Sequence, residues 1–148
     1  MKKLIIIILL NKTVSAQVEL KQNSKFYKLG EVTQMGAYIA DLKYTTGKKD
    51  TTYVLGFVNQ EYKTIIKTES VSFSGQSKLN QFYNILMSVF SEENRKDEKY
   101  SMNFILGETN MYVANSRTMA APFAYISTEH SHFTLNEKQV KKLFNKDK

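Results

Sequence analysis

Both histidines of the chain lie in one short polar segment, Glu129-His130-Ser131-His132. Side chains two residues apart in an extended segment point to the same side, so His130 and His132 could reach one metal ion. Zinc needs three or four ligands and further groups that orient them. A metal site at His130 and His132 is one interpretation of the segment, and a pH-responsive surface is a second. The third, which we favour, is an ordinary exposed turn.

A carboxylate inside an apolar strand is the second candidate. Asp41 lies between Ala40 and Leu42, and burial there would perturb its pKa and mark a functional site. The simpler interpretation, which we favour, places Asp41 in solvent on the other side of the strand from Leu42. A small secreted hydrolase or metal-dependent enzyme would require both histidines and a distant carboxylate such as Asp41 to converge within hydrogen-bonding reach.

Sequence signatures of catalysis are missing from the chain. It contains no G-x-S-x-G, H-E-x-x-H, phosphate-binding loop, G-x-G-x-x-G or EF-hand loop. It also contains no cysteine, which excludes a thiol nucleophile, a thiolate zinc site and a disulfide framework. We therefore expect no cofactor, and we favour a non-enzymatic function over an enzymatic one.

Residues 1–16 have the layout of a bacterial signal peptide. Lys2 and Lys3 precede the apolar run Leu4–Leu10, and the segment ends in Val14-Ser15-Ala16, with small or slim residues before the expected cut. As a helix, this run would be about 10 Å long, a third of a hydrocarbon core of about 30 Å, and so too short to anchor the chain. We expect cleavage after Ala16 and a secreted or periplasmic protein.

Residues 17–148 are predicted to form a single globular α+β domain. The chain is 42% hydrophobic and 12% aromatic, as is typical of a folded protein. Without the three lysines of the signal peptide, 18 of the 21 basic residues face 14 acidic ones, a net charge of +4. Nearly all are lysine, whereas nucleic-acid readout favours arginine. We expect another protein or a surface glycan as partner, no nucleic acid, and no stable membrane anchor after cleavage.

Seven strands are expected from stretches rich in Tyr, Val, Ile, Thr and Phe. Turns are expected at Gly30, at 45–50 and at 59–61, and Gly107-Glu108-Thr109-Asn110 is typical of a hairpin turn. The predicted strands are residues 25–29, 32–44, 52–58, 62–73, 100–106, 111–116 and 123–128.

Two helices are expected from apolar residues at helical spacing. The first spans Gln76–Ser91, with a broad apolar stripe. The second follows Thr134, whose spacing to Glu137 matches a capping box. The stripe residues of the two helices are Leu79, Phe82, Tyr83, Leu86 and Phe90, then Val140, Leu143 and Phe144.

These elements predict an α+β fold. We expect an antiparallel sheet or half-barrel of about seven strands, packed by one central amphipathic helix and a C-terminal helix. A small closed barrel of the pleckstrin-homology type, with the central helix as an insertion, matches the same count of elements.

The function these features favour is an exported small non-catalytic binding domain. Its ligand would dock on an exposed part of the sheet, where some of the nine tyrosines could form an apolar patch. The alternatives are the small hydrolase with His130 and His132, and a carrier of a small apolar ligand. The carrier would hold its ligand between sheet and helix, against Phe82, Leu86 and Phe90.

Overall fold

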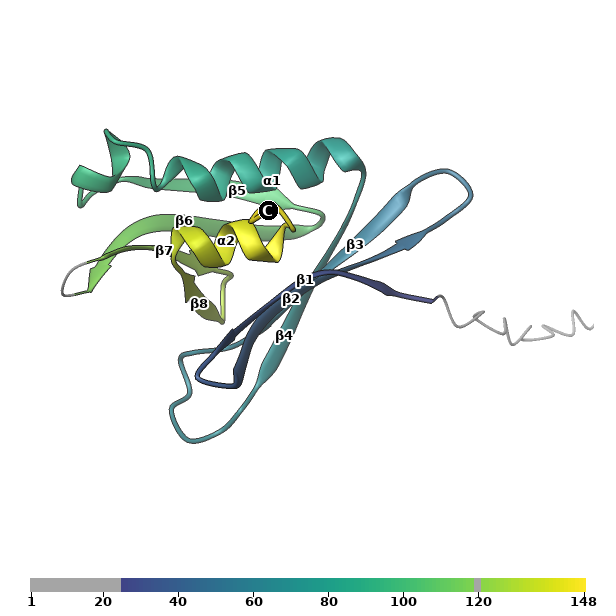
Figure 1. The fold of residues 1–148 in the computed structure, drawn as a ribbon, viewed down its shortest axis with the longest axis horizontal. Coiled ribbons are helices and arrows are strands. Elements are labelled where there is room, and N and C mark those ends of the chain that lie inside the picture. Colours follow the sequence, from purple (N-terminus) through teal and green to yellow (C-terminus); the bar gives the residue numbers. More distant parts are fainter. Residues whose placement is uncertain (1–24, 119–120) are drawn as a thin grey trace, which may run out of the picture.

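The computed structural model describes residues 25–118 and 121–148 (Figure 1). The predicted signal peptide, residues 1–16, lies outside the described residues, and its cleavage stays a prediction. None of the helices in the described part of the chain is long and apolar enough to cross a membrane.

The described chain contains two separate antiparallel sheets of four strands each. The first contains β1 (Tyr27–Gln34), β2 (Ala37–Thr46), β3 (Thr51–Val58) and β4 (Thr68–Ser74), and helix α1 (Gln76–Ser88) follows it. The second contains β5 (Ser101–Leu106), β6 (Thr109–Thr118), β7 (Ala121–Ser127) and β8 (His132–Leu135), followed by α2 (Glu137–Leu143). A short 3-10 turn, Asn94–Lys96, lies in the charged segment between α1 and β5.

The α+β class, the antiparallel pairing and the two helices are confirmed, but the single sheet or half-barrel of about seven strands is wrong. The closed-barrel alternative is wrong for the same reason. After Ser74 the chain turns through Gly75 (φ 103°) into α1, so β5 pairs with β6 and starts a new sheet instead of pairing with β4. The chain thus runs twice through one order, a four-stranded meander followed by a helix (Figure 1).

The first strand boundary differs from the prediction. The chain reverses at Met35-Gly36, where both residues have positive φ (50° and 80°), and not at Gly30. Gly30 instead lies within β1. The close packing of α2 against this position leaves no room for a side chain. A Cβ at this position would lie 2.2 Å from the carbonyl oxygen of Leu143.

The second half of the chain also differs in two places. The segment 132–135 forms β8, paired with β7, whereas the last strand predicted from the sequence ended at residue 128. The α2 cap is Asn136, whose Oδ1 accepts from the Gln139 amide (2.9 Å) while Gln139 Oε1 accepts from the Asn136 amide (2.9 Å). The predicted capping box from Thr134 is therefore wrong, because Thr134 is already part of the strand.

Helix α1 is confirmed, and it ends at Ser88 rather than Ser91. Its Phe82 sits where both sheets and both helices meet. The Phe82 ring lies 6.0 Å from Phe73 of β4, 5.9 Å from Phe104 of β5 and 5.4 Å from Phe144 after α2, between ring centroids. A second link joins the sheets directly, since Phe57 of β3 stacks on Phe133 of β8 at 4.4 Å.

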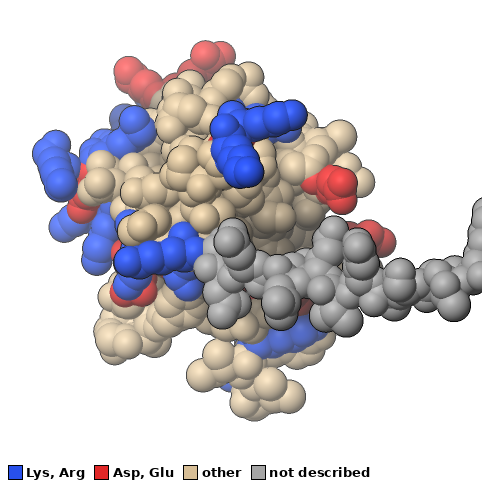
Figure 2. Space-filling view, turned by 90° about the vertical axis from the view of Figure 1, so that its right-hand side faces the viewer, with Lys and Arg blue, Asp and Glu red and all other residues tan. Residues whose placement is uncertain are grey.

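Surface charge is mixed on the face seen in Figure 2. Basic and acidic side chains both occur there, and most of this face carries neither. Several pairs are close enough for ion pairs, such as Lys28 with Glu31 (2.8 Å) and Lys141 with Glu137 (2.7 Å). Exposed pairs of this kind contribute little to stability.

Candidate functional site

His130 lies within a tight turn between β7 and β8, and His132 follows that turn as the first residue of β8. The Thr128 amide donates to the Ser131 carbonyl (2.9 Å), and the two hydroxyls lie 2.6 Å apart. His130 is exposed and faces Glu129 at 3.6 Å. The His132 ring instead stacks on Tyr125, with centroids 5.1 Å apart.

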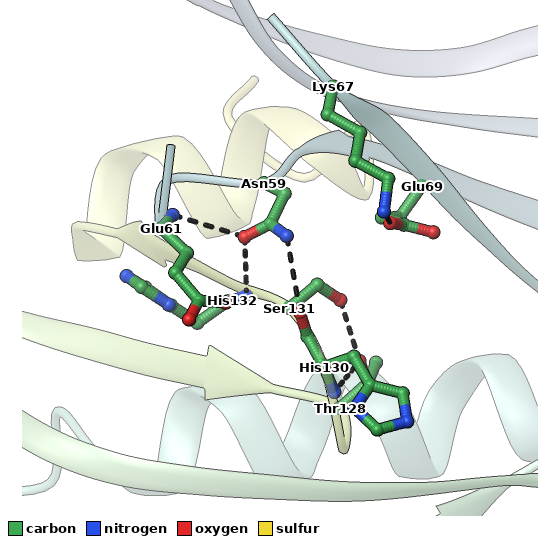
Figure 3. Close-up of polar contacts among 8 residues, drawn as sticks. All are labelled: Asn59, Glu61, Lys67, Glu69, Thr128, His130, Ser131 and His132. Atoms are coloured by element: carbon green, nitrogen blue, oxygen red, sulfur yellow. Dashed lines mark hydrogen bonds and ion pairs between the residues drawn. The ribbon is translucent and has the colours of Figure 1, made fainter. Parts of the chain in front are cut away.

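The histidine rings point away from one another (Figure 3). The turn breaks the alternation on which the shared metal depended, because only His132 belongs to the strand. Within residues 25–118 and 121–148, no three His, Asp or Glu side chains are grouped closely enough to hold a metal ion. Asp41 is therefore not a third ligand for His130 and His132. Metal binding by these two residues stays a prediction.

No pattern in the sequence marked Asn59, the residue that holds this turn in place. Its side chain is fully buried. The Asn59 Nδ2 donates to the His130 carbonyl (3.2 Å), and its Oδ1 accepts from the amides of His132 (3.3 Å) and Glu61 (3.1 Å) (Figure 3). One amide thus connects the end of β3 to the β7–β8 turn of the other sheet.

Gln60 extends the same connection along β8. The backbone amide of Gln60 donates to the His132 carbonyl (2.8 Å). The side-chain Oε1 of Gln60 accepts from the backbone amide and the hydroxyl of Thr134, both at 3.1 Å. The base of the β3–β4 connection is therefore fixed to the second sheet. The predicted strand 62–73 begins only at Thr68, because residues 61–67 form a projecting loop.

Beyond this base, large apolar side chains project into solvent. Met35 is fully exposed, Ile66 is 85% exposed and Ile65 is 66% exposed. Met35 lies at the tip of the β1–β2 hairpin, and the 61–67 loop leaves the first sheet at the same end, at the lower left of Figure 1. We call the four exposed apolar residues of these two tips the hairpin-tip patch: Met35, Tyr62, Ile65 and Ile66.

Charged groups border the hairpin-tip patch. Lys67 Nζ lies 5.7 Å from the centre of the Tyr62 ring and 3.1 Å from Glu69 Oε1 (Figure 3). The hydrogen bond to Glu69 raises the pKa of Lys67 above its ordinary value. Lys63 is also exposed. The patch is therefore apolar at its tip and polar at its rim.

Asp41 forms a second polar cluster, on the outer face of the first sheet. Asp41 points away from Leu42, as predicted. It is only 5% exposed, so the prediction that it lies in solvent is wrong. Its carboxylate accepts from the Tyr38 hydroxyl (2.8 Å) and pairs with Lys43 Nζ (2.8 Å). Its strand neighbour Gly56 leaves room for it, since a Cβ there would lie 2.5 Å from Asp41 Oδ1.

A β-bulge brings Tyr38 over this carboxylate. Val32 pairs with Ala40 and Thr33 pairs with Tyr38, so Ile39 is the extra residue and Tyr38 moves to the outer face. Burial raises the pKa of the Tyr38 phenol well above its usual 10.0, and the hydrogen bond to Asp41 is the second-largest cause of the increase. A protonated phenol and an ammonium group both bind this carboxylate, which is an arrangement for holding a charge rather than for moving a proton.

The side chains predicted to line a carrier cavity lie in the core. Phe82 and Leu86 are fully buried, and Phe90 is nearly so. Phe82 is surrounded by aromatic rings from β4, β5 and the end of α2. These three residues pack the fold together, and an apolar ligand for the domain stays a prediction.

The described residues thus offer two kinds of surface, an apolar projection at one end and a polar cluster on the outer sheet face. Neither holds an arrangement that by itself defines a reaction. Comparisons of the chain with protein-family models, with curated proteins and with solved structures find no match.

Proposed function

We propose that the chain is an exported, non-catalytic binding domain that docks on another protein through the hairpin-tip patch. The exposure of Met35, Ile65 and Ile66 carries this proposal. Four of the eight large apolar side chains exposed in residues 25–118 and 121–148 belong to these two turns at one end of the first sheet. Clustered apolar exposure of this kind is typical of interaction sites, because a partner removes it from water.

The geometry of the tips favours a partner with an apolar groove. The patch projects beyond the sheet, so a concave surface would bury more of it than a flat one. Its base is held by Asn59 and Gln60, which reduces the conformational entropy that binding would cost. The unbranched Met35 adapts to an irregular groove.

The polar clusters support a non-catalytic role. Asp41 already accepts from two donors, and Asn59 is used to connect the sheets. A general base needs a lone pair directed at substrate, and both groups are committed to partners within the fold.

Site-specific photocrosslinking in the source cells tests the docking proposal. A photoreactive phenylalanine replaces Ile66 in one variant and Ile105, a 70% exposed isoleucine on β5, in the matched control. We expect a discrete crosslinked species from position 66 that disappears when Met35→Ser is added, and none from position 105. Equal crosslinking at both positions, or crosslinking to lipid alone at position 66, would overturn the proposal.

Export is tested separately by N-terminal sequencing of the protein recovered outside the cytoplasm. The proposed cleavage gives a chain beginning at Gln17. A cytosolic protein that retains Met1 contradicts export, but it leaves the docking proposal open to the crosslinking test.

A further inference from the structure

A row of four aromatic rings crosses the inner face of the first sheet, at the end opposite the hairpin-tip patch. Each strand supplies one ring, and the residues are direct register partners: Tyr27, Tyr44, Tyr53 and Phe73. Neighbouring centroids are 5.6, 6.3 and 5.4 Å apart along the row. Tyr27 is exposed and Phe73 is buried, so the row runs from solvent into the core.

A cavity of about 340 Å³ lies against the middle of this row. Tyr44 and Tyr53 form its aromatic wall. The first turns of α1 and the chain after α2 form the opposite side, with Gln76, Asn80 and Phe144 among the lining residues. Figure 2 views this end of the molecule, where the surface is mostly uncharged.

Two polar groups that line the cavity have hydrogen-bonding capacity that the described residues do not use. The Tyr53 hydroxyl donates to Gln76 Oε1 (2.8 Å), and Gln76 Nε2 donates to Asn80 Oδ1 (3.3 Å). This series of hydrogen bonds occupies the side-chain oxygen of Asn80, but Asn80 Nδ2 has no hydrogen-bond partner among the described residues. The Tyr44 hydroxyl also has no hydrogen-bond partner within the described part of the protein. Amide and phenol groups next to ring faces can bind a ligand that has both apolar faces and hydroxyls.

We infer that this cavity binds a neutral sugar ring. The C–H face of a sugar ring stacks on Tyr44, and its hydroxyls accept from Asn80 Nδ2 and exchange hydrogen bonds with the Tyr44 hydroxyl. A volume of about 340 Å³ is at the small end of ligand pockets, which suits one or two sugar rings. Among the described residues that line the cavity, Lys146 is the one cation and none is an arginine, which argues against a phosphate ligand.

This site is independent of the proposed docking surface, because it lies at the other end of the first sheet (Figure 1). A sugar at one end and a protein at the other would let the domain attach a partner to a glycan-bearing surface. Failure of either proposal leaves the other standing.

Titration of the ¹⁵N-labelled chain, followed by amide chemical shifts, tests the inference. The probes are the methyl glycosides of glucose, galactose, mannose and N-acetylglucosamine, with inorganic phosphate as a separate arm. We expect at least one glycoside to bind in the millimolar range and to shift the amides around Tyr44 and Asn80, with no shifts around Met35 or Ile66.

Two exposed asparagines one turn apart on α1 provide a matched pair of variants. We expect Asn80→Ala to weaken glycoside binding about tenfold and Asn84→Ala to leave it unchanged. Tyr44→Ala abolishes binding through loss of the stacking face, whereas Tyr44→Phe retains part of it. The inference is overturned if no glycoside shifts these amides at tens of millimolar, if Asn84→Ala weakens binding as much as Asn80→Ala, or if only phosphate binds.

Discussion

The side chain of Asn59, at the end of β3, accepts a hydrogen bond from the backbone amide of His132, the first residue of β8, at 3.3 Å. These residues lie 73 positions apart, and the bond joins the connection after β3 of the first sheet to β8 of the second. The neighbouring amide of Gln60 donates to the His132 carbonyl, so the backbone of His132 is held on both sides. His132 thus contributes to the fold through its backbone and through the stacking of its ring on Tyr125.

Removal of the Asn59 amide is expected to loosen the contact between the sheets. Asn59→Ala leaves the backbone amide of His132 and the carbonyl of His130 without this part-buried partner, and we expect it to lower the free energy of unfolding by about 2–4 kcal/mol. Asn103→Ala, on the exposed face of β5, should change it by less than about 0.5 kcal/mol. Urea denaturation measures both, and equal losses would contradict the role assigned to Asn59.

Alanine substitutions at two glycines with positive φ distinguish the cost of backbone strain from the cost of a steric clash. A Cβ at Gly107 (φ 63°) would lie 2.1 Å from the Ser72 carbonyl oxygen, whereas a Cβ at Gly36 (φ 80°) meets nothing within 4 Å. Gly36→Ala should therefore cost only the left-handed strain, about 1–2 kcal/mol. Gly107→Ala adds a clash between the β5–β6 hairpin and β4, and we expect a loss of at least about 3 kcal/mol. Similar losses in thermal unfolding would show that the hairpin does not pack against β4 as described.

Stability is expected to fall at alkaline pH because of Tyr38. The folded pKa of this phenol is raised, by burial first and then by Asp41, so the unfolded chain loses this proton near pH 10.0 while the folded chain keeps it. The stabilisation is complete below that pH and is lost as the pH rises above it toward the folded pKa.

Three chains test this linkage through the slope of unfolding free energy against pH just above pH 10. We expect the steepest decline in the unmodified chain and the shallowest in Tyr38→Phe, which lacks the titrating group. Asp41→Asn should fall between them, because burial of Tyr38 remains. A Tyr38→Phe chain with the full slope would assign the alkaline loss to other groups.

Phe82 is the residue on which both halves of the fold most depend. Phe82→Ala removes a ring that contacts aromatic residues from β4, β5 and the end of α2, and we expect it to cost about 3–5 kcal/mol. Ile105→Ala, at a 70% exposed position on β5, should cost less than about 1 kcal/mol. Guanidinium denaturation compares them, and a small effect at Phe82 would indicate a loosely packed centre.

Local pattern was sufficient to predict α1 and the strands at 52–58 and 100–106. In α1, the spacing of Leu79, Phe82 and Leu86 requires one buried face, and the structure buries all three. The segment 59–67 was predicted poorly because its hydrogen bonds run to β8, a partner far away in sequence. The candidate sites depend on similar distant partners, so neither the hairpin-tip patch nor the aromatic row was specified beforehand.

The sequence by itself determined the α+β class, the antiparallel strands and the stripe of α1, because these follow from periods of two and 3.6 residues. It also determined that no disulfide holds the fold, since the chain has no cysteine. Only the tertiary structure decided that the strands divide into two sheets, that Asp41 is buried beneath Tyr38, and that His130 and His132 point apart. Each of these outcomes depends on contacts between residues on different strands or at a turn, which the pattern within a single element does not encode.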